Sequence, residues 1–263
     1  MKRILLFLAK FAISGAILAY LVYQAHANAV FADLVQRPKN WSLLACAVLA
    51  YVAGLGITIV RWWYLVRALG MDFSLRESFR LGLLGFLFNL APMGIVGGDL
   101  LKAVMLARQQ PRYRAESLVT VFVDRVIGLY VLFVVASVAI LATGMWRLEA
   151  TSVQIACKSV WVLTAVGTVA VILPLAPDLS RGKSIELCGR IPYVGSPLKK
   201  ILLALRAYRL KLPVLCACAL ATVVVHGLFV LVAFWICAAL YTPHPTLGTH
   251  FVVMPVSTAT SVI

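Results

Sequence analysis

The chain consists mainly of long apolar runs separated by shorter polar stretches. A helix of about 20 residues crosses about 30 Å of hydrocarbon, and five runs reach that length. They lie at 4–23, 41–62, 118–143, 157–176 and 213–240. Because backbone groups inside a bilayer must bond within their own segment, the runs predict an all-α, polytopic transmembrane helix bundle. We expect one integral membrane domain over 1–263.

A sixth apolar segment, 81–96, is short and ends in Pro92 and Gly94. If it dips into the membrane and returns, 19 of the 24 Lys and Arg residues fall on the side of the N-terminus. Basic residues collect in cytoplasmic loops, so this layout predicts a re-entrant hairpin and a cytoplasmic N-terminus. The alternative is a short, tilted helix followed by an ordinary turn.

A second short apolar segment, 249–263, is interrupted by Pro255. It follows the span 213–240 as 81–96 follows the span 41–62, but from the opposite side. This order indicates a possible inverted repeat, an architecture that places transport sites near the midplane. Because the chain stops inside this segment, we expect it to be incomplete.

The longest cytoplasmic stretch, 177–212, is basic. Near its end, Leu198, Ile201, Leu205 and Tyr208 repeat at helical spacing, mostly opposite Lys and Arg side chains. This pattern predicts an amphipathic helix on the cytoplasmic leaflet, or else a topology anchor that leads into the next span.

Composition narrows the classes of function. The 263 residues are 63% hydrophobic and 13% charged, with a mean hydropathy of +0.99. A soluble domain of this size cannot bury so much apolar surface. The net charge of +15 fits cytoplasmic loops that meet anionic lipid headgroups, and we expect no nucleic-acid partner. The six cysteines form no CxxC pair, so we expect no metal and no cofactor.

The first candidate constellation interrupts the apolar pattern near the predicted hairpin. It comprises Pro92, Gly94, Gly97, Gly98, Asp99 and Lys102. A glycine-rich turn that opens a helix presents free N–H groups to an anion such as a lipid phosphate, and Lys102 adds positive charge. The alternative is that Asp99 caps the next helix and pairs locally with Lys102. Upstream, Ser74 and Glu77 have the spacing of a capping box.

The second constellation is Asp124 and Arg125, about a turn and a half into an otherwise apolar span. Charges in membrane helices usually face a cavity or a partner, so Arg125 is a candidate phosphate ligand, with Asp124 orienting a basic neighbour. The alternative is a buried structural ion pair near the interface. Trp62, Trp63 and Tyr64, beside Arg61 and Arg67, suggest an aromatic belt with basic anchors. His226 suggests a polar contact between helices.

Together these segments resemble the flippase-like, lysylphosphatidylglycerol-synthase transmembrane-region family. The resemblance rests on "RWWYLVRALG", "NLAPMGIVGGDLLKAVMLAR" and "SLVTVFVDRVIGL" in this order. The family shows a Pro-Gly-Gly-Asp-like element, here Pro92, Gly94, Gly98 and Asp99, and then an acidic–Arg–x–x–Gly element, here Asp124, Arg125 and Gly128. This chain has Asp124 where Glu is common. It ends where relatives continue into a second Pro- and Gly-rich element followed by Glu.

The resemblance implies a membrane protein that translocates a phospholipid or lipid-linked headgroup between leaflets. A soluble aminoacyl-transferase domain, which gives the bifunctional relatives their synthase activity, is absent from this sequence, and no catalytic motif occurs. We therefore expect no enzyme activity. The alternative is a membrane scaffold or accessory subunit for a glycosyltransferase or lipid-modifying enzyme. Either role places the chain in the cell (inner or plasma) membrane, with membrane lipids as partners.

Overall fold

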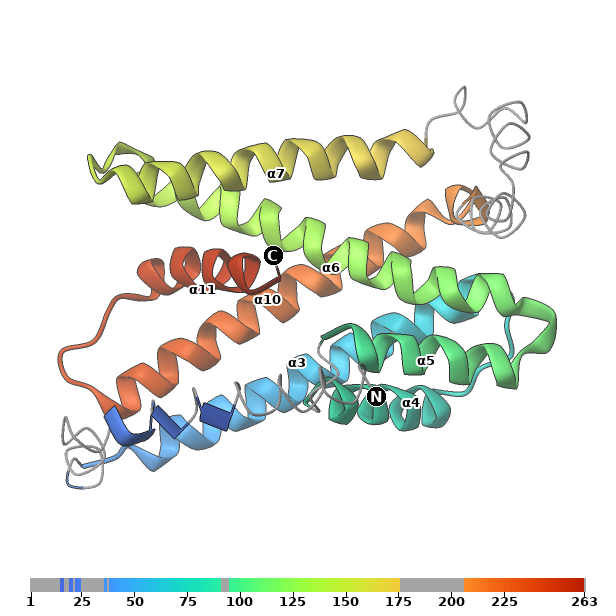
Figure 1. Cartoon of the computed structure of the whole chain (residues 1–263), viewed down its shortest axis with the longest axis horizontal. Coiled ribbons are helices and arrows are strands. Elements are labelled where there is room, and N and C mark those ends of the chain that lie inside the picture. Colours follow the sequence, from blue (N-terminus) through green and yellow to red (C-terminus); the bar gives the residue numbers. More distant parts are fainter. Residues whose placement is uncertain are drawn as a thin grey trace.

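The computed structural model describes residues 38–90, 95–175 and 206–262, together with a few positions between 15 and 36. The described residues form helices and no strands (Figure 1). The helices are α3 (Trp41–Ala68), α4 (Leu75–Leu90), α5 (Ile95–Gln109), η1 (Pro111–Tyr113), α6 (Arg114–Thr143), η2 (Met145–Arg147), α7 (Thr151–Leu175), α10 (Leu212–Leu240) and α11 (Leu247–Val262). The chain is therefore an all-α helical bundle, as predicted.

Four of these helices are long and apolar enough to cross a membrane. They are α3, α6 with the preceding η1, α7 up to Ile172, and α10. They occupy the expected runs 41–62, 118–143, 157–176 and 213–240, and each begins earlier or ends later than the apolar pattern alone indicates. Most of the expected span 4–23 and most of the amphipathic segment 177–212 lie outside the described residues.

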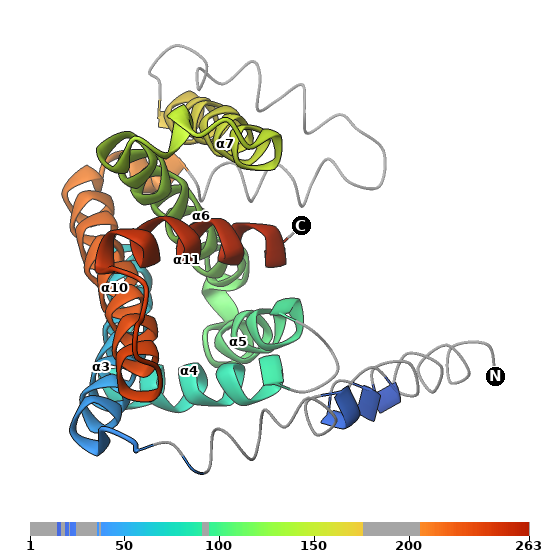
Figure 2. The same cartoon turned by 90° about the vertical axis from the view of Figure 1, so that its left-hand side faces the viewer.

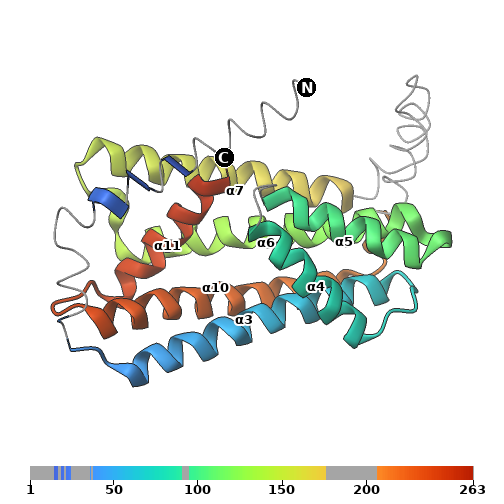
Figure 3. The same ribbon diagram turned by 60° about the horizontal axis from the view of Figure 1, so that its bottom comes forward.

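Helices α3 and α10 form the central antiparallel pair of the bundle (Figure 3). The backbone N–H of Asn40, before α3, donates to the carbonyl of Ala239 at the end of α10 (3.2 Å). Helix α6 packs against both, and α7 packs on α6 partly through hydroxyl groups, with Ser137 Oγ 2.7 Å from Thr164 Oγ1. Hydroxyl contacts of this kind join helices where apolar burial does not distinguish protein from lipid.

A buried ion pair joins the three central helices. Arg61 of α3 donates from Nε to Asp124 Oδ1 of α6 (2.8 Å) and from Nη1 to Thr222 Oγ1 of α10 (2.6 Å). The predicted interfacial belt was therefore wrong for Arg61 and Trp62, which are buried, whereas Tyr64 and Arg67 are exposed. The reason is the length of α3: it continues to Ala68, which places Arg61 about 10 Å inside the helix end.

Helices α4 and α5 form an antiparallel hairpin whose open ends meet near the end of α3. Gln110 Nε2 donates to the carbonyl of Asp72 (2.6 Å), so the hairpin starts and finishes at one end of the bundle. The predicted capping box is confirmed, because Ser74 and Glu77 exchange side-chain-to-backbone hydrogen bonds of 3.1 and 3.2 Å. That the hairpin re-enters the membrane remains a prediction.

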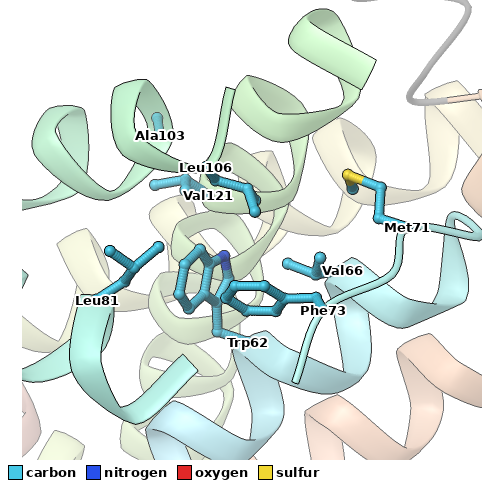
Figure 4. Close-up of a cluster of buried hydrophobic side chains, with 8 residues drawn as sticks. All are labelled: Trp62, Val66, Met71, Phe73, Leu81, Ala103, Leu106 and Val121. Carbon is cyan, nitrogen blue, oxygen red and sulfur yellow. The ribbon is translucent and has the colours of Figure 1, made fainter. Parts of the chain in front are cut away.

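The expected single segment 81–96 was wrong in its bounds. It covers the second half of α4, the undescribed residues 91–94 and only the first two residues of α5. Each limb of the hairpin contains charged residues, at 76–80 in α4 and at 99–108 in α5. A search for apolar runs leaves these residues out, although they are compatible with a helix. At the base of the hairpin, Leu81, Ala103 and Leu106 pack on Trp62, Val66 and Val121 of α3 and α6 (Figure 4).

The two limbs approach closely at Gly85 and Gly98. A Cβ atom on Gly98 would collide with the Gly85 carbonyl oxygen and the Asn89 side chain. Instead, the Gly98 N–H donates to Asn89 Oδ1 across the hairpin (2.9 Å). The glycines therefore set the spacing of the limbs.

The segment before α10 docks on the bundle through Tyr208. This side chain is buried, and its hydroxyl donates to the carbonyl of Leu65 (2.9 Å). Burial raises the pKa of the Tyr208 phenol above its ordinary value. The last turn of the basic stretch therefore contacts α3 rather than lying free.

Replacing Gly98 with Ala should force the hairpin limbs apart. We expect a loss of about 1–3 kcal/mol in the free energy of unfolding, typical of an overpacked contact between backbones. Thermal unfolding in detergent micelles measures it. The matched control is Gly227→Ala in α10, where a Cβ meets nothing within 4 Å. Equal stability of the two variants would show that the close approach is absent.

Replacing Arg61 with Met should leave the Asp124 carboxylate buried without its cation, at a cost of about 3–5 kcal/mol. Adding Asp124→Leu should recover most of that loss, because the pair is then replaced by apolar side chains. Unfolding of the single and double variants measures the coupling. The control is Arg67→Met, also in α3, which breaks an exposed pair with Asp72 of the following loop. It should be close to neutral. An additive double variant would contradict the pairing.

Candidate functional site

The structure brings the two predicted constellations together. Asp99 and Lys102 lie on α5, and Arg125 lies on α6, where its guanidinium Nε donates to Asp99 Oδ2. Lys102 Nζ lies 3.0 Å from the other carboxylate oxygen of Asp99. We call these three side chains the Asp99 cluster. Pro92 and Gly94 lie outside the described residues.

Asp99 does not cap its helix. Helix α5 begins at Ile95, so Asp99 starts the second turn, and Gly97 and Gly98 lie inside the first turn rather than in a preceding loop. The predicted glycine-rich anion-binding turn at Gly97 and Gly98 was therefore misplaced. The predicted local pair of Asp99 with Lys102 is confirmed.

Asp124 and Arg125 belong to different networks. Asp124 pairs with Arg61 toward α3 and α10, whereas Arg125 pairs with Asp99 toward the hairpin. Consecutive residues point about 100° apart on a helix, so one cannot take the partner of the other. The expectation that Asp124 orients a basic neighbour holds for Arg61. The alternative of a buried structural ion pair holds for Asp124, whose partner is Arg61, but not for Arg125, whose side chain is 49% exposed.

The depth of Arg125 also differs from the expectation of a turn and a half. Helix α6 begins at Arg114, so Arg125 lies about 16 Å along the helix. The candidate span as a whole runs from Pro111 to Thr143, and its midpoint falls at Ile127, two residues from Arg125. The residue therefore lies near the middle of its span.

Arg125 lies between two packing contacts on one face of α6. Before it, Val121 packs against α5, and after it, Ala136 and Ile140 pack with Val252 of α11. Figure 2 shows α5 and α11 beside different stretches of α6. Along α6, Arg125 therefore follows the contact with the first hairpin and precedes the contact with the second short apolar element.

The Arg61–Asp124 pair and the Asp99 cluster differ in how much of their side chains is exposed. The side chains of Arg61 and Asp124 are 6% and 7% exposed, and those of Asp99 and Lys102 are 12% and 14% exposed. The Arg125 side chain, by contrast, is 49% exposed. The first pair is interior structure, whereas the Asp99 cluster offers one cation to a ligand.

Three further residues around the site were not assigned to it from the sequence. Arg61 and Thr222 complete the buried network, and the Trp62 ring lies 5.5 Å from Lys102 Nζ, within cation–π range. An arginine after twenty mostly apolar residues was the available signal for Arg61. His226 makes the polar helix contact that was predicted, with a ring nitrogen 3.2 Å from the Gly128 carbonyl.

We also searched the described part of the chain for groups of side chains that could bind a metal ion. No three His, Cys, Asp or Glu side chains gather there as a metal site. The five cysteines within it are free thiols. The chemistry that the described residues bring together is that of paired cations and carboxylates.

Comparison with known proteins gives one family. The family model described as lysylphosphatidylglycerol synthase TM region matches residues 7–263. No curated protein and no solved structure matches the chain. The match covers the hairpin, the Asp99 cluster and all four candidate spans. The chain therefore belongs to the lysylphosphatidylglycerol synthase transmembrane-region family and is a multi-pass helical membrane protein.

Proposed function

We propose that the protein translocates a phospholipid or lipid-linked headgroup between the leaflets of the cell membrane. The path passes the Asp99 cluster, between the α4–α5 hairpin and α11. The observation that carries this proposal is the half-exposed side chain of Arg125 near the middle of a candidate span.

A structural role alone does not account for that exposure. An arginine at the centre of a membrane helix costs about 2.5–3.5 kcal/mol on insertion scales. For Arg61, this cost is offset by hydrogen bonds to side chains on two neighbouring helices, and the residue is almost completely buried. Arg125 has one carboxylate partner and retains an open side. Membrane arginines placed in this way typically line ion or substrate pathways.

The charge of the cluster favours an anionic headgroup. Lys102 and Arg125 carry two positive charges against the single carboxylate of Asp99. The adjacent Arg61–Asp124 pair is neutral as a unit. One positive charge therefore remains for a phosphate, which arginine binds through paired hydrogen bonds.

The arrangement of the helices also supports transport. Helix α4 follows α3 at one end of the bundle, and α11 follows the antiparallel α10 at the other end. Transporters with inverted repeats place their site between two such halves, near the midplane. Along α6, Arg125 lies between the contact with α5 and the contact with α11, which supports a site of this kind.

We place the end of the bundle where α3 finishes in the cytoplasm. Among the described residues, that end carries Arg67, Arg76, Arg80, Arg108, Arg112, Arg114, Arg206, Arg209 and Lys211. The opposite end carries Lys39, Arg147 and Lys158. The bias follows the positive-inside rule and supports a cytoplasmic N-terminus.

Translocation is testable in liposomes that contain phosphatidylglycerol with a fluorescent headgroup-side label. The wild-type chain should expose inner-leaflet lipid to a membrane-impermeant quencher faster than protein-free liposomes do. Arg125→Gln should slow this by about tenfold or more, since a hydrogen bond to a charged group contributes about 1.5–3 kcal/mol. Asp99 keeps Lys102 as a partner in this variant.

The matched control is Arg112→Gln in η1, an exposed arginine at the basic end of the bundle. It should leave the rate unchanged. Equal rates in the Arg125 variant and the wild type would overturn the proposal. A wild-type chain that moves no lipid but co-purifies with a glycosyltransferase or lipid-modifying enzyme would instead support the scaffold role.

A further inference from the structure

The Asp99 cluster has an unequal distribution of hydrogen-bonding atoms. Arg125 uses its Nε to hold Asp99, and within the described part of the chain its two terminal amino groups have no hydrogen bond. These groups form the end of the guanidinium fork, and the side chain is 49% exposed. Two oxygens of one ligand can therefore bind without displacing Asp99.

Asp99 itself is withdrawn from a ligand. Its carboxylate is 12% exposed, because Lys102 and Arg125 hold its two oxygens from either side. Lys102 is in turn confined by the Trp62 ring at 5.5 Å and by the backbone at Gly85, where a Cβ would collide with its side chain. The carboxylate therefore contributes a fixed negative charge next to the ligand position.

The surroundings make the charge balance matter. Phe122 and Leu129, one turn before and one turn after Arg125, are apolar, and the neighbouring Arg61–Asp124 pair is internally neutral. Charges interact more strongly beside apolar side chains inside a membrane protein than in bulk water. A ligand that leaves a whole charge unbalanced is disfavoured there, whereas one that neutralises the cluster is favoured.

We propose that Asp99 sets the headgroup charge that the site accepts, and that the preferred ligand is a lipid phosphodiester with one negative charge. This rests on the proposed function only in placing a headgroup at Arg125. The cluster carries a net charge of one positive unit. A phosphodiester cancels it, whereas a phosphomonoester, with about −1.5 to −2 charges at pH 7, leaves an excess. A zwitterionic choline headgroup adds a cation beside Arg125.

Lipid binding to the full chain in phosphatidylcholine nanodiscs tests this proposal. Pyrene-tailed phosphatidylglycerol and phosphatidic acid serve as probes, each in competition with unlabelled phosphatidylcholine. The wild type should bind phosphatidylglycerol about tenfold more tightly than either other lipid. Asp99→Asn raises the cluster to two positive charges and should reverse the order, so that phosphatidic acid binds more tightly than phosphatidylglycerol.

Two further variants guard against a folding defect in the Asp99 variant. Lys102→Gln makes the cluster neutral and should remove the preference for phosphatidylglycerol over phosphatidylcholine. Glu116→Gln removes a carboxylate from the first turn of α6, outside the cluster, and should leave the order unchanged. An unaltered order in the Asp99 and Lys102 variants overturns the proposal. A uniform loss of binding to all lipids in Asp99→Asn does so too, since Asp99 then only orients Arg125.

The charge rule for binding and the transport proposal can be contradicted independently of each other. A chain that binds phosphatidylglycerol selectively but moves no lipid contradicts the transport proposal and supports the charge rule. A chain that moves phosphatidylglycerol, phosphatidic acid and phosphatidylcholine equally, with no order of binding, contradicts the charge rule and leaves transport standing.

Discussion

The arrangement of this bundle depends on the need to pair charges in an apolar medium. Asp124 and Arg125 are consecutive on α6, and a helix directs them to faces about 100° apart. Asp124 takes Arg61 on the side of α3 and α10, and Arg125 takes Asp99 on the side of the hairpin. One dipeptide therefore fixes where α6 meets the central helix pair and where it meets the hairpin. The buried pair is structural, and its exposed neighbour is available to a ligand.

The hairpin is built to present Asp99 at that level. A capping box starts α4, Leu81 and Leu106 fix its base, and the contact of Gly85 with Gly98 brings the limbs together. Asn89 bonds the Gly98 N–H, so the turn before Asp99 is held from the facing limb. The carboxylate consequently meets both Lys102, one turn later, and Arg125, on another helix. Close backbone packing thus controls the geometry of the charged site.

Much of the fold was predictable from local pattern. Apolar length identified the spans of α3, α6, α7 and α10, and Ser74 with Glu77 marked the start of a helix. The local Asp99–Lys102 pair also followed from spacing. Partners far apart in sequence did not: nothing local links Arg61 to Asp124, or Asp99 to Arg125. The depth of Arg125 was missed because helix α6 continues through the polar residues 114–117, which an apolar count excludes.

If α6 borders a polar path at the level of Arg125, as proposed, a cysteine at Leu129 reports it most directly. Leu129 lies one turn beyond Arg125, whereas Val138 is exposed on the opposite face of the helix by its spacing. With the six native cysteines replaced, Leu129→Cys and Val138→Cys are treated in liposomes with a membrane-impermeant, anionic thiol reagent. We predict rapid labelling of the cysteine at position 129 and little labelling of the cysteine at position 138. Equal, slow labelling at both positions would contradict it.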